Sequence, residues 1–385
     1  MKIEFNIIAH AKNHVFRLAE ILFKTNNLNK IYTIYPLFKL REYKLNKRNI
    51  ISLKFFAIII LLSKFLNIKY KKIYFSNFFD FLVSKKIKKD PNKQQLIIGL
   101  SGYCLKTIKK AKKLDYTTVV DRACPHILFQ KNIIEEEVFS LPIKNKKRFL
   151  SNSFDQEIID KMLLEYETCD YISVPSNYSA RSFKKFGLEE KVIFNRLIPE
   201  KKIITNQVHH EKEFIIFAVG YNFIRKGFYY LIKAMEKMQN IKNIKLQIRS
   251  TIPEGIEMKI PDNVQIIDKH ITNSELEKIY NKASIIALPS IDEGFGLSAI
   301  EAMSIGKPII ITKNVGMSDI IDKYSPELQN HILNIRDVNS IKDLILSLYE
   351  DKVYIKEVGH SFKKSFTEYM SSNEPFEFYK KKMKF

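Results

Sequence analysis

The sequence predicts an α/β protein built from two doubly wound domains, and three observations lead to this fold class. Strand-like and helix-like runs alternate along most of the chain, which is typical of a parallel sheet covered by helices. A length of 385 residues favours two domains over one. The alternation lapses around residues 199–212, where Pro199–Lys202 and His209–Lys212 are polar and lack a clear period. This stretch is predicted to be the linker.

The first series of runs, over residues 1–200, is predicted to form the amino-terminal domain. Its expected strands are apolar runs that end at turn residues, namely Ile3–Ile8, Lys30–Tyr35, Leu96–Gly99, Thr117–Asp121 and Tyr171–Pro175. Its expected helices are His14–Lys24, Lys106–Lys113 and Ile127–Val138.

The second series, over residues 201–371, is predicted to form the carboxyl-terminal domain. Its expected strands are Phe214–Val219, Ile244–Ile248, Val264–Ile267, Ser284–Pro289 and Pro308–Thr312. Its expected helices are Phe228–Met238, Asn273–Lys282, Leu297–Ile305 and Asn339–Tyr349. Ligands bind outside the carboxyl ends of strands in such sheets, so the cleft between the domains is the expected active site.

Composition excludes several classes of protein. Hydrophobic residues make up 45% of the chain, enough for sizeable cores. Cys104, Cys124 and Cys169 form no CxxC pair, so neither a disulfide framework nor a zinc site is expected. Met1–Ile8 enters a strand-like run without the basic start of a signal peptide, and Phe55–Leu62 is far shorter than the roughly 20 apolar residues of a membrane-spanning helix. These features predict a cytoplasmic protein that does not cross a bilayer.

The positive charge is concentrated at one end of the chain. Of the net charge of +22, residues 1–150 carry +21, because they hold 31 Lys and Arg against 10 Asp and Glu. Such a field attracts a polyanion, and an anionic membrane surface, a phosphate-bearing substrate and nucleic acid are the candidates. The alternative is a lysine-rich composition that only solvates the surface. Within this region, Leu40–Lys93 mixes basic, aromatic and aliphatic residues, which suits either an interfacial segment or a core helix with a solvated lysine face.

The most informative segment runs from Pro289 to Glu301. An apolar strand ends at Pro289, a loop follows with Gly294 and Gly296 on either side of Phe295, and a helix is predicted to start at Leu297 or Ser298. Glycines let the main chain approach a ligand, and the amides at a helix start favour an anion. The carboxylates of Glu293 and Glu301 bracket this loop. Taken alone, Glu301 could form a capping box with Ser298, and Glu293 could be a solvated loop residue.

The segment from Pro289 through Gly306-Lys307-Pro308-Ile309-Ile310 resembles the signature of glycosyltransferase family 4, including the two glutamates with seven residues between them. The resemblance implies a GT-B fold, with two Rossmann-like domains, and a last helix over residues 372–385 that packs back on the first domain. It implies that Glu301 binds the ribose of a nucleotide and that Glu293 lies by the transferred sugar. It also implies that the amides of Gly294, Phe295, Gly296 and Leu297 contact the sugar and diphosphate.

A second motif, Val219–Gly227, follows a strand and opens a helix. It resembles the Arg-Lys-Gly element of the same family, which implies that Arg225 and Lys226 bind the donor diphosphate. Adjacent cations neutralise the charge that develops on a departing diphosphate. Many relatives carry arginine directly after the glycine that ends this strand, whereas this chain has Tyr221.

Resemblance in the first half is weaker. Glu165–Tyr178 resembles the last strand of the family's first domain, with the following helix starting near Ser176. His126 follows the strand Thr117–Asp121 and is the candidate for a catalytic histidine that contacts the donor sugar, against an incidental loop histidine. His10 and His14 lie four residues apart, but without a third ligand no metal site is expected.

These observations predict a retaining glycosyltransferase that moves a sugar from a nucleoside-diphosphate sugar to an acceptor hydroxyl. The basic first domain suggests a lipid-linked or membrane-associated glycan acceptor in cell-surface polysaccharide or lipopolysaccharide synthesis, and therefore a protein at the inner face of the membrane. No cofactor, metal or nucleic-acid partner is expected. Transfer to a soluble sugar or sugar phosphate, phosphorolysis, and nucleic-acid binding are the alternatives.

Overall fold

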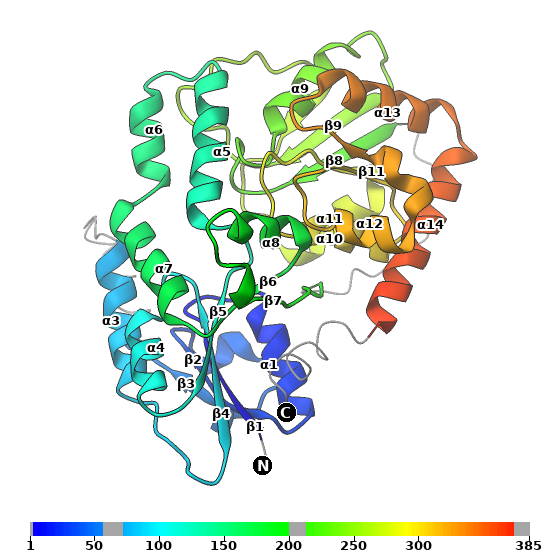
Figure 1. Cartoon of the computed structure of the whole chain (residues 1–385). Helices are drawn as coiled ribbons and strands as arrows, with labels where there is room; N and C mark the ends of the chain where they lie inside the picture. The colour runs from blue at the N-terminus through cyan, green and yellow to red at the C-terminus, as the bar shows by residue number, and fades with distance from the viewer. Residues whose placement is uncertain (1–2, 57–71, 200–212, 373–385) are drawn as a thin grey trace.

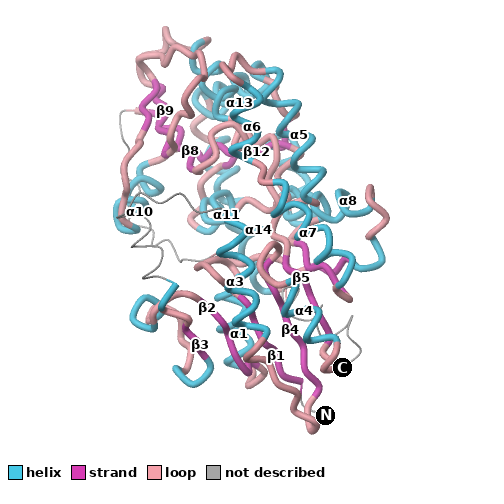
Figure 2. The backbone as a smooth tube through the Cα atoms, turned by 90° about the vertical axis from the view of Figure 1, so that its left-hand side faces the viewer, coloured by secondary structure: helices cyan, strands magenta, loops and turns pink. Residues whose placement is uncertain are grey.

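The computed structural model describes residues 3–56, 72–199 and 213–372, and it contains two parallel sheets, each covered by helices (Figure 1). The predicted fold class of two doubly wound α/β domains is therefore confirmed. The first sheet lies at one end of the molecule and the second at the other, in both the view of Figure 1 and the view turned by 90° in Figure 2.

The first sheet has the strand order β3-β2-β1-β4-β5-β6-β7, with every pair parallel. Its strands are β1 (Ile3–Ile8), β2 (Leu28–Thr33), β3 (Ile50–Ser52), β4 (Gln94–Leu100), β5 (Thr117–Asp121), β6 (Tyr171–Val174) and β7 (Val192–Phe194). Its helices are α1 (Val15–Lys24), α3 (Lys72–Ser84), α4 (Leu105–Lys112), α5 (Ile127–Ser140), α6 (Lys146–Ser153), α7 (Gln156–Thr168) and α8 (Asn177–Lys184).

The second sheet has the order β10-β9-β8-β11-β12-β13, again all parallel. Its strands are β8 (Phe214–Val219), β9 (Ile244–Arg249), β10 (Val264–Ile266), β11 (Ile285–Leu288), β12 (Ile309–Thr312) and β13 (Ile332–Leu333). Its helices are α9 (Phe228–Glu236), α10 (Asn273–Lys282), α11 (Leu297–Ser304), α12 (Ser318–Tyr324), α13 (Val338–Glu350) and α14 (Tyr354–Ser371).

The central strands are mostly apolar because both faces of each sheet are covered, and β8 and β11 are apolar at every position. In the first sheet, Ile7 and Val119 pack into a core that includes α1, while their neighbours Ile8 and Val120 point the other way, into a core that includes α3, α4 and α7. Successive side chains of a strand point to opposite faces, so two cores share one sheet. This arrangement produces the continuous apolar runs seen in the sequence.

Helix α5 departs from the simple two-domain division. Ile134 and Val138 of this helix, with Leu141 and Ile143 just after it, belong to the hydrophobic core of the second domain. The buried carboxylate of Glu137 also accepts a hydrogen bond from Arg336 at 2.7 Å. Figure 1 shows α5 extending from the first domain alongside the second. Part of the amino-terminal sequence is therefore built into the other half of the molecule.

One expectation about the first domain was wrong. The strand at Tyr171 is not the last of its sheet, because β7 follows it and pairs with it at the edge. With three residues, β7 is too short to show a period in the sequence. The helix expected near Ser176 is confirmed as α8, and Ser176 caps it by accepting a hydrogen bond from the N–H of Ser179 at 3.2 Å.

Several predicted segments lie outside the described residues. They are most of the apolar run Phe55–Leu62, nearly all of the linker at residues 199–212, and nearly all of the segment 372–385. At the end of the described chain, the hydroxyl of Tyr369 in α14 donates a buried hydrogen bond to the carbonyl oxygen of Leu197 at 2.7 Å. Over the described ranges, no helix combines the length and apolar character needed to span a bilayer.

Candidate functional site

In each sheet the strand order reverses at one point, between β1 and β4 in the first sheet and between β8 and β11 in the second. Ligands of doubly wound sheets bind at this reversal, outside the carboxyl ends of the strands. The loops that follow these four strands are therefore where a site is expected. All but one of the predicted donor residues lie in the loops of the second sheet or at the first residue of the helix that follows, and Glu301 lies further along that helix.

Arg225 and Lys226 lie in the loop after β8 and reach the loop after β11. Nη1 of Arg225 donates to Glu293 Oε2 at 3.0 Å and to the carbonyl oxygen of Asp292 at 2.9 Å. Nζ of Lys226 donates to the same Oε2 of Glu293 at 2.5 Å. The structure thus brings together two cations and a carboxylate that lie almost 70 residues apart in the sequence. The set Arg225, Lys226 and Glu293 is called the donor cluster below.

A glycine permits this close approach of the two loops. Gly227 adopts a left-handed φ of 67°, and a Cβ at this position would lie 1.9 Å from the carbonyl oxygen of Pro289. The main chain of the two loops is also joined directly, because the N–H of Ile291 donates to the carbonyl oxygen of Arg225 at 2.9 Å. Any other residue at 227 would separate the cations from the carboxylate.

The donor cluster is short of negative charge. Its side chains are only 11–21% exposed. Burial raises the pKa of Glu293, but the charges of Lys226 and Arg225 outweigh this effect and lower that pKa to about 2. The pKa of Lys226 is lowered by burial and by the charge of Arg225, and the single carboxylate of Glu293 does not outweigh these two effects. An anion bound here would remove this imbalance.

The ionised state of Glu293 should make stability depend on acid. Its folded pKa of about 2 lies below the unfolded value near 4.5, so its contribution is present above about pH 4.5 and is lost as the pH falls towards 2. A shift of this size corresponds to about 3 kcal/mol of unfolding free energy. Between neutral and acid pH, the unfolding free energy of wild type should therefore fall by about 3 kcal/mol more than that of Glu293→Gln, as measured by urea unfolding. If the unfolding free energies of the two proteins changed equally with pH, the lowered pKa of Glu293 would be contradicted.

The loop between Glu293 and α11 presents a row of main-chain donors. Gly296 precedes the helix with φ of 106°, so α11 starts at Leu297 as predicted. Among the described residues, none accepts a hydrogen bond from the N–H of Gly294, Phe295, Gly296 or Leu297. Consecutive amides without acceptors at a helix start form an anion-binding surface, and this one adjoins the donor cluster.

Glu301 lies one turn into α11 and is not part of a capping box. The residue that caps this helix is Gly296 rather than Ser298. The carboxylate of Glu301 instead accepts a hydrogen bond from the hydroxyl of Tyr280 in α10 at 3.1 Å. Burial and the charge of Glu301 raise the pKa of Tyr280 well above its usual value, so this hydroxyl remains a donor. Glu301 is thus held in place by a neighbouring helix.

His126 occupies a different environment from the donor cluster. Its ring is buried, stacks on Phe186 at 3.9 Å, and caps α5 by accepting a hydrogen bond from the N–H of Leu128 at 3.3 Å. Burial and the charge of Arg122 lower its pKa to about 4, which keeps it neutral. Within the described parts of the chain, no hydrogen bond joins His126 to the donor cluster. Its catalytic role stays a prediction.

Asp292 is a site residue that sequence reasoning missed. Its buried carboxylate accepts hydrogen bonds from two residues of the first domain, the amide of Gln130 at 2.6 Å and the hydroxyl of Tyr178 at 2.9 Å. Its carbonyl oxygen holds Arg225. The side chain of Arg122 donates to Gln130 at 2.9 Å and so extends this network into the first domain. The position beside Glu293 was the only available signal, since both partners are more than a hundred residues away.

The first domain meets the donor loop at Gly294. A Cβ on Gly294 would lie 2.1 Å from the carbonyl oxygen of Ala123, and the hydroxyl of Ser176 donates to the carbonyl oxygen of Gly294 at 2.6 Å. A Cβ on Gly316 would lie 2.1 Å from that same oxygen. The two domains are therefore in main-chain contact at the residue where the sequence predicted ligand contacts.

The two histidines after β1 do different things. His10 stacks on Tyr103, from the loop after β4, with ring centres 3.5 Å apart, and burial lowers its pKa to about 4. Nε2 of His14 donates to the carboxylate of Asp121 at 2.6 Å, and Asp121 also accepts a hydrogen bond from Ser173 at 2.9 Å. These residues lie at the carboxyl ends of the first sheet, on the side that faces the donor loops. The His14–Asp121 pair was not predicted, because its members lie 107 residues apart.

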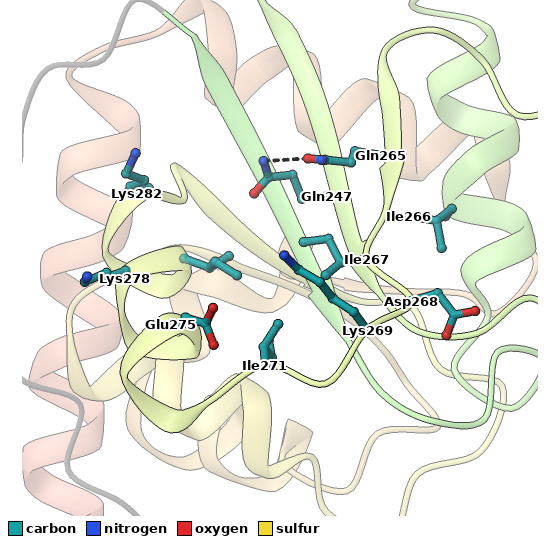
Figure 3. A pocket seen from close by; sticks show the side chains of 11 residues that line it. Gln247, Gln265, Ile266, Ile267, Asp268, Lys269, Ile271, Glu275, Lys278 and Lys282 are labelled. Atoms are coloured by element: carbon teal, nitrogen blue, oxygen red, sulfur yellow. Dashed lines mark hydrogen bonds between the residues drawn. The ribbon is translucent and has the colours of Figure 1, made fainter.

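A hollow of about 640 Å³ lies elsewhere in the second domain, between β9, β10 and α10 (Figure 3). Gln247 and Gln265, joined by a hydrogen bond of 3.1 Å, line its strand side, and Lys278 and Lys282 line its helix side. None of the predicted site residues lines this hollow. The donor cluster and the hollow are therefore separate features of the same domain.

Residues 199–368 match the family model of Glycosyl transferases group 1. The chain is similar to a glycosyltransferase of Methanocaldococcus jannaschii, with 30% identity over 44% of this chain and 49% of that protein. It is also similar to the O-antigen chain mannosyltransferase RfbU of Salmonella typhimurium, with 25% identity over 43% of this chain and 48% of that protein. The matched part of the chain thus spans about half the length of these curated relatives.

A solved structure of Staphylococcus aureus TarM resembles the whole chain, with a TM-score of 0.66 over 98% of this chain and 99% of that one at 13% identity. This likeness establishes the GT-B fold over both domains. The prediction of a transferase enzyme is supported by the family match and by relatives named as glycosyltransferases. The narrower prediction of family 4 remains a prediction.

Proposed function

We propose that this chain is a retaining glycosyltransferase that moves a sugar from a nucleoside-diphosphate sugar to an acceptor hydroxyl. The observation that carries the proposal is the imbalance of the donor cluster, in which two buried cations share one carboxylate beside the amides of Gly294–Leu297. A diphosphate supplies the missing negative charge. The TarM structure is a complex that contains UDP, which is in keeping with such a donor.

In this proposal the bond between the anomeric carbon and the diphosphate oxygen breaks, and the acceptor oxygen bonds to the same face of the sugar. Arg225, Lys226 and the start of α11 neutralise the charge that collects on the leaving diphosphate. The acceptor proton passes to an oxygen of that diphosphate, so the chain supplies no nucleophile. Glu293 keeps the two cations aimed at one point, and Glu301 binds the ribose hydroxyls as a two-oxygen acceptor.

The acceptor in this proposal is a lipid-linked or membrane-associated glycan of cell-surface polysaccharide synthesis. The excess charge of +21 in residues 1–150 supports an anionic surface, and the relative RfbU is named for an O-antigen chain. The acceptor would enter over the first sheet, at the ends of β1 and β4, where His10, Tyr103 and His14 lie. The protein would then work at the inner face of the membrane.

The test is nucleotide release from a panel of nucleoside-diphosphate sugars, with and without membrane extract. Nucleotide release from one donor, only when the extract is present, would support the proposal. Glu301→Ala should abolish that release. Tyr280→Phe should raise the KM for the donor about tenfold with little change in kcat, because it removes one hydrogen bond to the charged carboxylate of Glu301. Nucleotide release with soluble acceptors alone would instead favour transfer to a soluble sugar or sugar phosphate. If no donor of the panel released nucleotide and none raised the thermal stability of the protein, the proposal would be contradicted.

Gly294→Ala should reduce transfer by about 100-fold. The new Cβ would meet the main chain of Ala123, which cannot move aside as a flexible side chain would, and a shift of about 1 Å at a reacting group costs this much. The control is Gly187→Ala. Unlike Gly294, Gly187 has positive φ, but the space around it is open, so the substitution should cost about 1 kcal/mol of stability without loss of activity. Normal transfer by Gly294→Ala would show that the contact between the domains is not needed.

A further inference from the structure

Helix α3 carries an exposed aromatic ridge on the first domain. Tyr74, Phe78 and Phe81 are 65%, 45% and 40% exposed, and they follow one another at intervals of four and three residues. This spacing places them on one face of the helix. The opposite face packs into the core through residues such as Phe79 and Val83. These three residues are called the α3 ridge below.

The ridge continues into neighbouring aromatic and basic residues. Phe55, 38% exposed, packs edge-on against Phe78 with ring centres 6.3 Å apart. The ammonium groups of Lys85 and Lys106 lie 5.4 and 5.5 Å from the ring centre of Phe81. Lys85 directly follows the last residue of α3, four residues after Phe81, so the row of rings ends in a positive charge.

Lysines of α4 extend the positive surface beside the ridge. Lys106, Lys109 and Lys110 are exposed on α4, and Lys113 is exposed directly after its end, at the spacing of one helix face. In the described part of the chain, none of these four lysines pairs with a carboxylate, whereas Lys112 pairs with Asp170. The helices are fixed to each other, because the buried carboxylate of Asp80 in α3 accepts hydrogen bonds from the first amides of α4. Figure 1 shows α3 and α4 side by side on the outer part of the first domain.

The same helix is anchored to the proposed acceptor end of the sheet. The hydroxyl of Ser76 in α3 donates to the carbonyl oxygen of Gly102, and Lys161 donates to that hydroxyl at 2.8 Å. Glu165 accepts from the N–H groups of Gly102 and Cys104. These contacts hold the loop after β4, which carries Tyr103, against the inner face of the ridge helix. The α3 ridge and the loop after β4, whose Tyr103 stacks on His10, are therefore held together by direct contacts.

We infer that the α3 ridge and the α4 lysines seat the first domain on an anionic lipid bilayer. Exposed aromatic rings along one helix face suit the boundary between lipid headgroups and acyl chains, and unpaired lysines beside them suit anionic headgroups. A helix lying flat on the surface buries such a row without crossing the bilayer. Binding to the bilayer is inferred independently of the proposed function. Only its role, which is to bring a lipid-linked acceptor to the loop after β4, rests on that function.

The test is sedimentation of the full chain with vesicles of zwitterionic lipid, alone or mixed with anionic lipid. Wild type should bind the mixed vesicles. Lys109→Ala with Lys110→Ala should bind them about 30-fold less, the equivalent of about 1 kcal/mol for each lysine. Lys356→Ala with Lys364→Ala, on exposed positions of α14 in the second domain, is the matched control and should bind as wild type does.

A second set of variants tests the rings. Tyr74→Ser, Phe78→Ser and Phe81→Ser combined should lower binding at least about tenfold, because the rings supply the buried apolar area. The control is Phe139→Ser, which removes an exposed ring that also has a lysine, Lys146, over it. Equal binding by the ridge variant and this control, absence of wild-type binding to anionic vesicles, or selective capture of RNA in their place would each overturn the inference.

The same proteins separate this inference from the proposed function. The ridge and lysine variants should keep the thermal stabilisation given by a nucleoside-diphosphate sugar, because their substitutions lie far from the donor cluster. If wild type binds vesicles but no donor, the proposed function is contradicted and the inferred membrane-binding surface is still supported. If it binds a donor but no vesicles, only the inferred membrane-binding surface is contradicted.

Discussion

Replacing Lys226 by methionine is expected to lower sugar transfer by about 100- to 1,000-fold. The substitution keeps the aliphatic stem over Gly220 but removes the charge that would neutralise the leaving diphosphate in a water-poor site. Nucleotide release under saturating donor measures the loss in kcat. The size of the effect follows from burial, because the side chain of Lys226 is only 11% exposed and water cannot replace its charge.

The control for this substitution is Lys233→Met in the following helix. Lys233 pairs with Glu236 at 2.8 Å and is one third exposed, so its loss should leave transfer unchanged. Thermal unfolding of both variants shows whether a fall in rate comes from loss of structure. If Lys226→Met transferred sugar at the wild-type rate, the diphosphate would have to bind elsewhere.

Asp292→Ala should have the largest effect on stability. The substitution leaves the amide of Gln130 and the hydroxyl of Tyr178 without their buried acceptor. It also removes the carboxylate that joins these two residues of the first domain to the second. Unsatisfied buried donors cost about 1–3 kcal/mol each, so a loss of about 2–5 kcal/mol of unfolding free energy is expected in urea titrations. Transfer should fall by about 100-fold as well, because the loop loses the side-chain contacts that hold it, and its carbonyl oxygen at residue 292 positions Arg225.

Asp292→Asn separates the hydrogen bonds of this side chain from its charge. It keeps one acceptor oxygen for Gln130, and its NH2 group can donate to the hydroxyl of Tyr178, so it should recover most of the lost stability. Asp262→Ala, at an exposed position of the same domain, should change unfolding free energy by less than about 0.5 kcal/mol. An Asp292→Ala protein as stable as the Asp262→Ala control would mean that the contacts between the domains carry little energy.

The donor half of the site was predictable because its signals are local. The strand, the two-glycine loop and the helix start lie within thirteen consecutive residues, and α11 begins at Leu297 as the pattern indicated. Gly227 and Gly296 are needed for positive φ, and glycine is the residue that marks such positions in a sequence. The alternative capping role of Glu301 is excluded, because Ser298 fits the capping pattern but follows the true helix start.

The other half depends on pairings between distant residues, which no local pattern reveals. His14 meets Asp121, and Gln130 and Tyr178 meet Asp292, only because strand ends from separate parts of the chain gather at one edge. The surroundings of His126 also come from distant parts of the chain. Its position after a strand predicted a catalytic role, which stays a prediction, and the aromatic side chains around its ring lie 40 to 60 residues further along the sequence.

The stretch that contains α3 was ambiguous for a physical reason. Aromatic residues occur on both faces of the helix, since Phe79 is fully buried while Phe78 is 45% exposed. A pattern of apolar and polar residues cannot separate a buried ring from an exposed one when both faces are aromatic. The buried face of α3 agrees with a core helix, and the exposed face is the part on which the interfacial interpretation depends.

Because α5 belongs to the first part of the sequence but packs into the second domain, it limits where the chain can be cut to express the second domain by itself. A fragment that starts at the linker would lack Ile134 and Val138, and the core of the second domain would then meet water where these side chains now lie. It would also lack Gln130 and Tyr178, so Asp292 would lose both partners. The boundary that is natural in the sequence is therefore a poor place to cut, and the smallest useful fragment of the donor half must keep residues that the chain provides long before it.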